Sequence, residues 1–274
     1  MAQIMGILNV TPDSFYAGSR KQTERDIALR ADEIITQGGG IIDVGAMSTR
    51  PGGNNLSETE EMERLRYALP IVKRQQPEAI ISVDTFRPMV ARMVVEEFGV
   101  DIINDVGPDA IAASSLIETV DDVIDPSEVH PAVPSLMPMF REVARLGVDY
   151  VLMSRDANIE TMKTFFTDSL NALNRLGAKK NIILDPGYGF GKTIEENYAI
   201  LRRQAELCSY GLPILAGVSR KRMIWQLLGT SADEALNGTT VLHSLALQNG
   251  ANILRAHDVR EAAETIKILE AFVK

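Results

Sequence analysis

The chain has 274 residues, of which 45% are hydrophobic and 24% charged, proportions typical of a globular protein with a substantial core. Its net charge of −9 argues against nucleic acid or an anionic membrane as a partner. The single cysteine cannot form an internal disulfide, and no apolar run approaches the roughly 18 residues of a membrane span, so we expect a cytoplasmic protein.

Eight short apolar runs recur along the chain, and each ends near a polar residue or a glycine. In chain order they are IMGILN, IIDVG, AIISVD, DIINDV, DYVLMS, NIILDPG, PILAGVS and ANILRAH. The first has no basic flank, which predicts a strand and not a signal peptide. Amphipathic stretches such as RDIALRADEIITQ and IEENYAILRRQAEL lie between the runs and predict helices.

Eight strands alternating with helices predict a single (β/α)8 TIM barrel domain over residues 1–274. A doubly wound sheet is the structural alternative. That fold usually has a glycine-rich first turn, and the first turn here is NVTPDSF.

The connection between the fourth and fifth strands is longer than an ordinary loop. It contains the acidic, proline-broken VDDVIDPSEVHPAVP and then the helix-like SLMPMFREVARLG. We expect an enlarged excursion over residues 106–148, and a mobile surface insertion is its simplest interpretation.

Polar side chains follow nearly every predicted strand, and in a barrel such strand ends converge on one mouth. Capping of the next helix explains any one of them but not a set drawn from the whole ring. The set comprises Asn9, Asp43, Asp84, Asn104, Asp105, Asp185, Ser219, Arg220, Lys221, Arg255 and His257, with Met153 ending the fifth strand. Asp43 by itself is explained as a buried acid held by backbone N–H groups.

One group of these residues suits a flat heterocycle with amide and amine edges: Asp84, Asn104, Asp185 and Lys221. Asp185 begins DPGYGFGKT, which is not a nucleotide-binding loop because Pro186 stands where that loop needs a glycine. A carboxylate can instead accept two parallel N–H bonds from a guanidine-like edge.

A second group suits an anion. Arg255 and His257 resemble a phosphate clamp beside the N-terminus of a helix near Asp258. Asn9, which we expect opposite this pair, carries an oxygen that could ligate Mg²⁺. The polar segments NVTPDSFYAGSRK and GAMSTRPGG are long for such loops and are typical of lids.

In order along the chain, seven stretches resemble the dihydropteroate synthases: GILNVTPDSF, STRPGG, SVDTFRP, IINDV, LDPGYGFGKT, GVSRK and RAHDV. The resemblance extends from residue 4 to the end of the chain. It implies a (β/α)8 barrel, commonly a homodimer, that joins p-aminobenzoate to a dihydropterin carrying a methyl diphosphate. The products are dihydropteroate, a folate precursor, and pyrophosphate, and sulfonamides compete with the aminobenzoate.

The resemblance also implies roles for individual residues. The pterin would be held by Asp84, Asn104, Asp185 and Lys221, with Met153 and Phe190 packing on its ring. The diphosphate and Mg²⁺ would be held by Asn9, Arg255 and His257. The aminobenzoate would contact Thr49, Pro51 and Ser219. The implied mechanism is an S_N1-like substitution, with catalytic roles for Asp84, Asp185, Lys221 and Arg255.

The sequence departs from the family pattern at several positions. Ala17 stands in the first lid where an acid is usual, Met47 in the second lid where a glutamate is usual, and Ser154 after the fifth strand in place of a histidine. These changes leave open a pterin-binding paralogue without synthase activity. A methyltetrahydrofolate-dependent methyltransferase shares the barrel, but the clamp of Arg255 and His257 and the STRPGG lid argue against it.

Other features have simpler interpretations. His130 and His243 are isolated in the sequence, so we do not expect a zinc site. The acidic run ETEEMER is most simply the solvated face of a helix, and the Met-rich SLMPMF and Trp225 are more typical of a core.

Overall fold

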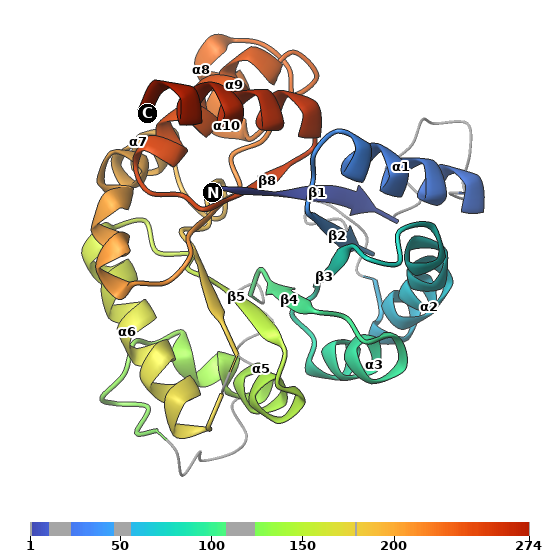
Figure 1. Ribbon diagram of the computed structural model, residues 1–274. Coiled ribbons are helices and arrows are strands. Elements are labelled where there is room, and N and C mark those ends of the chain that lie inside the picture. Colours follow the sequence, from blue (N-terminus) through green and yellow to red (C-terminus); the bar gives the residue numbers. More distant parts are fainter. Residues whose placement is uncertain (1, 11–22, 47–55, 108–123, 179, 274) are drawn as a thin grey trace.

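The structure is a computed structural model that describes residues 2–10, 23–46, 56–107, 124–178 and 180–273. Its strands form one parallel eight-stranded sheet, which Figure 1 shows wrapped into a ring inside an outer layer of helices. The strands are β1 (Gln3–Asn9), β2 (Ile41–Gly45), β3 (Ile80–Asp84), β4 (Ile102–Asp105), β5 (Asp149–Met153), β6 (Ile182–Asp185), β7 (Leu215–Ala216) and β8 (Ile253–Ala256). The strand order is β6-β5-β4-β3-β2-β1-β8-β7, and a bridge between Leu184 and Ile214 closes the ring. The predicted (β/α)8 barrel is confirmed.

Helices follow the strands and cover the outside of the barrel. They are α1 (Glu24–Thr36), α2 (Glu58–Gln75), α3 (Pro88–Phe98), α5 (Val133–Leu146), α6 (Ile159–Arg175), α7 (Ile194–Arg203), the 3₁₀ helix η1 (Gln204–Tyr210), α8 (Arg222–Leu228), α9 (Leu236–Gln248) and α10 (Val259–Val273). None of the helices in the described ranges is long and apolar enough to cross a membrane.

Local sequence fixes where three of these helices begin. A capping box begins each of them, at Thr23, Ser57 and Thr193. In each box the hydroxyl accepts from the backbone N–H three residues later, and the acidic side chain at that later position accepts from the backbone N–H of the capping residue. Such boxes satisfy helix N–H groups that otherwise lack partners. They therefore fix where α1, α2 and α7 begin.

The interior of the barrel is built in layers. Its lower layer is apolar and nearly inaccessible, and its members come from seven strands: Met5, Ile41, Ile102, Val151, Ile183, Leu215 and Ile253. Side chains alternate between the two faces of a strand, so the residue two positions later points to the same side. The next inward layer is therefore Ile7, Asp43, Asn104, Met153, Asp185, Gly217 and Arg255. This change from apolar to polar places the chemistry directly above a packed floor.

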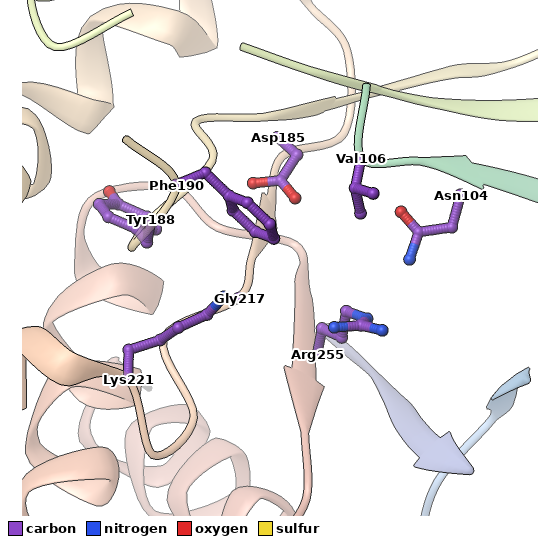
Figure 2. Close-up of a pocket in the computed structure, with 8 residues that line it drawn as sticks. All are labelled: Asn104, Val106, Asp185, Tyr188, Phe190, Gly217, Lys221 and Arg255. Carbon is purple, nitrogen blue, oxygen red and sulfur yellow. The ribbon is translucent and has the colours of Figure 1, made fainter. Parts of the chain in front are cut away.

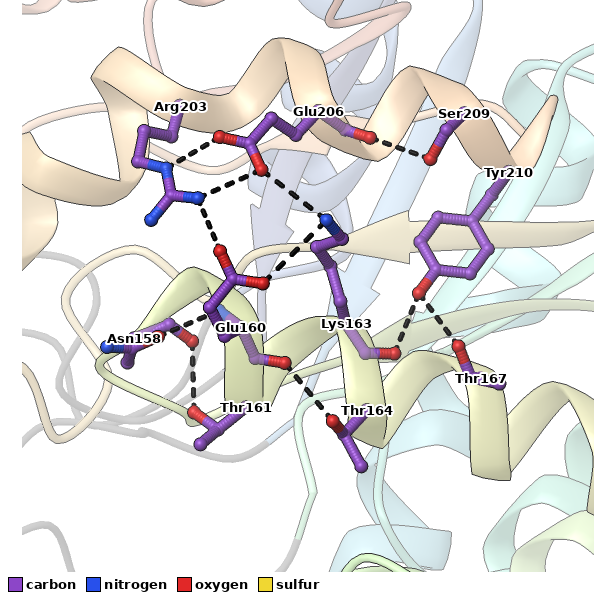
Figure 3. Close-up of polar contacts among 10 residues, drawn as sticks. All are labelled: Asn158, Glu160, Thr161, Lys163, Thr164, Thr167, Arg203, Glu206, Ser209 and Tyr210. Carbon is purple, nitrogen blue, oxygen red and sulfur yellow. Dashed lines mark hydrogen bonds and ion pairs between the residues drawn. The ribbon is translucent and has the colours of Figure 1, made fainter.

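Helices of the outer layer also contact one another, as Figure 3 shows for α6, the last residue of α7 and η1. Arg203 pairs with Glu160 at 2.5 Å and with Glu206 at 2.6 Å, and Tyr210 donates to the backbone oxygen of Lys163 at 2.7 Å. Exposed pairs of this kind contribute little stability individually. They join three helical elements that carry no predicted site residue.

The excursion after β4 contains a helix that packs into the core. The predicted helix within it is α5, and Leu136, Met137, Met139 and Phe140 are buried there, so the core assignment of SLMPMF is confirmed. Residues 108–123 lie outside the described part. The His130 Nε2 lies 3.1 Å from Asp156, which in turn accepts from Ser154 Oγ at 2.6 Å.

Candidate active site

A chain of ionic hydrogen bonds crosses the mouth of the barrel. Arg255 donates from Nε to Asp43 and from Nη2 to Asp84, both at 2.7 Å. Asp43 also accepts from Ser82 Oγ at 2.6 Å and from Asn104 Nδ2 at 3.1 Å. These bonds link β2, β3, β4 and β8 through five side chains.

One expectation is corrected by this network. Asp43 does not end a strand: it lies in the middle of β2, fully buried, and is held by side chains and not by backbone N–H groups. The guanidinium of Arg255 also reaches inward to Asp84, which belongs to the predicted pterin group. The network therefore connects a residue of the predicted diphosphate group with one of the predicted pterin group.

Three carboxyl groups and two cations crowd this space. Burial raises the pKa of Asp84 to about 7, with Asp43 and Glu61 adding to the rise and Arg255 opposing it. Burial also raises the pKa of Asp185 and lowers that of Lys221 to about 8. The Asp84 carboxyl group therefore takes up a proton readily near neutral pH.

A pocket of about 260 Å³, part of it open to solvent, lies beside the network. It is lined by Asn104, Val106, Asp185, Tyr188, Phe190, Gly217, Lys221 and Arg255. Figure 2 shows the polar ends of Asn104, Asp185 and Arg255 turned toward one space, with the ring of Phe190 alongside. The Lys221 ammonium lies 4.2 Å from the centre of that ring, in cation–π contact. Planar ring, carboxylate, amide and cations together suit a flat, nitrogen-rich ligand.

The glycine-rich loop after β6 fixes the position of the Asp185 carboxylate. Gly187 donates its N–H to Asp185 Oδ1 at 2.7 Å and has φ +65°, a conformation that favours glycine. A Cβ there would lie 2.1 Å from the backbone oxygen of Ser154. The buried Lys192 ammonium donates to the carbonyls of Gly187 at 2.9 Å and Ser154 at 3.1 Å. The loop after β5 and the loop of Asp185 are thus fastened together.

Alternation along β4 separates two neighbouring polar residues. Asn104 points into the barrel, whereas Asp105 points outward and accepts from the Tyr150 hydroxyl at 2.6 Å. Burial raises the pKa of Asp105 to about 6, opposed by the bonds from Tyr150 and Gly107. Asp105 therefore lies between the barrel and its helices, where its bond from Tyr150 stabilises the fold.

The remaining predicted residues lie at the rim or beside the pocket. Met153 is buried and is register partner of Asp185. Asn9 ends β1, and its strand pairs with β8, so it is a neighbour of the Arg255 strand and not opposite it. The His257 ring lies at the exposed rim, and its backbone N–H donates to the buried Ser219 Oγ at 3.2 Å. Thr49 and Pro51, like Ala17 and Met47, lie outside the described residues.

Sequence reasoning missed several residues of this region. Glu61, expected on a solvated helix face, is fully buried and pairs with Arg87 beside the loop after β3. Lys192 and Gly217 were not singled out either. Period-two counting from the apolar layer identifies Gly217 and Asp43, whereas the burial of Glu61 depends on how α2 packs.

Magnesium is compatible with the donors at this mouth. No group of three or more His, Cys, Asp or Glu side chains that could hold a metal occurs within the described ranges. Mg²⁺ needs only one or two protein oxygens when a substrate phosphate supplies others. The amide oxygen of Asn9, at the mouth end of the strand next to β8, fits that role.

Comparison with known proteins agrees with this geometry. Residues 5–257 match the family described as "Pterin binding enzyme". The dihydropteroate synthase of Escherichia coli (strain K12) is 38% identical over 280 residues, which cover 98% of this chain and 90% of the relative.

Solved structures give the same answer. A dihydropteroate synthase from Clostridium difficile, crystallised in the presence of pteroic acid, superposes with a TM-score of 0.81 at 31% identity, covering 99% of this chain and 96% of that one. The enzyme from Xanthomonas albilineans with 4-aminobenzoic acid gives 0.80 at 32% identity, covering 99% and 93%.

The chain therefore belongs to the pterin binding enzymes, the class that a (β/α)8 barrel with this polar inner layer defines. Within that class its relatives are dihydropteroate synthases, which are transferases. The resemblance found in the seven sequence motifs is confirmed.

Proposed function

We propose that this protein condenses p-aminobenzoate with (7,8-dihydropterin-6-yl)methyl diphosphate, giving 7,8-dihydropteroate and pyrophosphate for folate synthesis. The observation that carries the proposal is the pocket in which Asn104, Asp185, Lys221 and Arg255 converge beside Phe190. The dihydropteroate synthases to which the chain is related support it, including those solved with pteroic acid and with 4-aminobenzoic acid.

In this proposal the dihydropterin lies in the pocket with its ring against Phe190 and Met153. Asp185 accepts the two N–H groups of the pyrimidine edge, and Asn104 pairs with a neighbouring donor and acceptor. Lys221 leaves its contact with Phe190 to donate to a ring acceptor. The pocket is small for a bicyclic ligand, so this movement of Lys221 is part of binding.

The leaving group lies toward β1 and β8. Arg255 and His257 hold the diphosphate, and Asn9 holds Mg²⁺, which when bound neutralises charge on the diphosphate oxygens. An arriving diphosphate favours the protonated ring, so His257 can gain a proton and donate to the departing pyrophosphate.

The reaction breaks the C–O bond between the exocyclic CH₂ and the diphosphate and forms a C–N bond to the aminobenzoate. The electron pair of the C–O bond leaves with pyrophosphate, and the dihydropterin carries the positive charge that develops at carbon. Asp185 and Asp84 stabilise that charge electrostatically. The neutral arylamine supplies its lone pair and then loses one proton, so no strong base is needed.

The aminobenzoate lies at the rim near Ser219, with Thr49 and Pro51 of the second lid as further contacts. Ser219 is buried and accepts from the backbone N–H of His257, which supports an aminobenzoate position next to the diphosphate. The arylamine would then approach the exocyclic carbon from one loop, and the pyrophosphate would depart from that carbon toward the neighbouring loop.

We also propose a homodimer in the cytoplasm. Apolar side chains are exposed on three neighbouring helices, α8, α9 and α10: Leu227, Leu228, Val241, Leu245, Ile268 and Phe272. Figure 1 shows these helices on one side of the barrel, away from α2 and α3. Such a patch suits a self-complementary interface, and a sedimentation mass of one chain would contradict it. The single, exposed cysteine suits a reducing compartment.

The proposed reaction is tested by measuring pyrophosphate release from purified protein with the dihydropterin diphosphate and Mg²⁺, with and without p-aminobenzoate. Release that depends on aminobenzoate and is matched by dihydropteroate supports the proposal, and chelation of Mg²⁺ should abolish it. Asp185→Asn should lose activity, whereas Glu206→Gln on the outer helix layer should not. Tight pterin binding without release would show the pterin-binding paralogue instead.

A further inference from the structure

The turn after β7 contains a backbone conformation that its residue does not favour. Lys221 N–H bonds to the carbonyl of Val218 at 3.2 Å, closing a four-residue turn over Ser219 and Arg220. Arg220 has φ +52°, the one positive φ among the non-glycine residues of the described ranges. Glycine would adopt this conformation without strain, so the arginine side chain must contribute something that offsets it.

That side chain makes four hydrogen bonds to two other segments. Its Nε and Nη2 donate to the two carboxylate oxygens of Asp258, each at 2.9 Å, in a bidentate pair. Its Nη1 donates to the backbone oxygens of Ala232 and Asp233 at 2.9 and 2.7 Å. The backbone N–H of Arg220 donates to Thr239 Oγ1 at 2.9 Å. The turn is therefore fixed to the loop after β8 and to the segment before α9.

The residues on either side of Arg220 both belong to the proposed site. Ser219 turns toward the loop after β8 and accepts from the His257 N–H, while the side chain of Lys221 lies over Phe190 in the pocket. A left-handed residue between them reverses the chain, which lets consecutive side chains serve different parts of the mouth. Asp258 directly follows His257, so the ion pair joins the two loops at that point.

We propose that Arg220 and Asp258 form a positioning pair, which holds the loops after β7 and β8 in the relative placement that the two substrates need. The inference rests on the proposed function and deepens it. Neither residue touches a substrate. Arg220 orients Ser219 and Lys221, and Asp258 holds that turn against His257. Because rate depends steeply on the alignment of reacting groups, loosening the pair should lower turnover more than stability.

Arg220→Lys is the central variant, since lysine keeps the charge but cannot form the bidentate pair and the two carbonyl bonds together. We expect at least a tenfold fall in kcat and at least a fivefold weaker affinity for the dihydropterin diphosphate, measured by calorimetry. Arg222→Lys, the same substitution at an exposed position two residues on, is the matched control and should leave both unchanged.

Arg220→Gly distinguishes the effect of the strained Arg220 backbone from the effect of its side-chain hydrogen bonds. Glycine relieves the backbone and removes the side chain, so the inference requires that kcat falls as it does in Arg220→Lys. Asp258→Asn should lower kcat as well. The kcat of the double variant Arg220→Lys, Asp258→Asn should be only slightly below that of whichever single variant has the lower kcat. Additive losses would mean that the two residues do not act as a pair, and wild-type kcat in Arg220→Gly would mean that the side chain is not needed.

The binding measurement keeps this inference distinct from the proposed function. Wild-type protein that does not bind the dihydropterin diphosphate would overturn the proposed function. Wild-type protein that binds it, with an unchanged affinity and kcat in Arg220→Lys, would overturn the positioning pair alone. A lower melting temperature without either change would identify a purely structural ion pair and would also overturn it.

Discussion

Removing Arg255 should destabilise the apoprotein as well as weaken substrate binding. In Arg255→Ala, Asp43 and Asp84 lose the cation that bonds both of them at 2.7 Å. Breaking a buried pair by removing one partner typically costs about 3–5 kcal/mol. Asp84, with its pKa raised to about 7 by burial, can take up a proton at little cost, and Asp43 keeps its bonds from Ser82 and Asn104. We therefore expect the lower end, about 3 kcal/mol.

The measurement is the free energy of unfolding by denaturant at pH 8 and pH 5, with thermal unfolding alongside. At roughly 2–4 °C per kcal/mol, the melting temperature should fall by about 6–12 °C. Arg255→Lys is the matched control and should lose less, because it keeps the charge. The part of the loss due to Asp84 should shrink at pH 5, where that carboxyl group is protonated. An unchanged unfolding free energy in Arg255→Ala would refute the ionic network.

Three further predictions test the residues around this network. Asp185→Asn should weaken dihydropterin affinity roughly 10–100-fold in calorimetry, since bonds to a charged partner contribute about 1.5–3 kcal/mol, and unchanged affinity would contradict its role. Because the folded pKa of Asp84 is raised above its unfolded value, its contribution to stability is present at low pH and lost as pH rises toward 7. The unfolding free energy measured with denaturant should thus fall from pH 5 to pH 8, and it should fall less in Asp84→Asn than in the wild type. An equal fall in both proteins would refute this role of Asp84. Gly187→Ala and Gly191→Ala both place alanine at φ +65°, which costs roughly 1–2 kcal/mol. Of these two sites, only Gly187 brings the new Cβ close to a backbone oxygen. The unfolding free energy of Gly187→Ala should therefore fall by ~1–3 kcal/mol more than that of Gly191→Ala. Equal losses in the two variants would show that the backbone moves aside at no cost.

The sequence by itself determined the barrel and most of the inner polar layer. Eight apolar runs fix eight strands, and a period of two fixes which side chains share a face with that apolar floor. That is why Asn104, Asp185 and Arg255 could be named from their places in the strands. Local patterns also determined helix starts, because a capping box needs only a hydroxyl and an acid three residues apart.

Only the tertiary structure decided which of these residues pair. Arg255 and Asp43 are 212 positions apart, and nothing local to either sequence specifies that a guanidinium should reach two carboxylates inside the ring. The burial of Glu61 depends in the same way on the packing of α2 against the loop after β3. Barrel closure also makes β1 a neighbour of β8, so that Asn9 lies beside the Arg255 strand. Strand identity follows from short-range periodicity, whereas ion pairing and burial follow from how the ring closes.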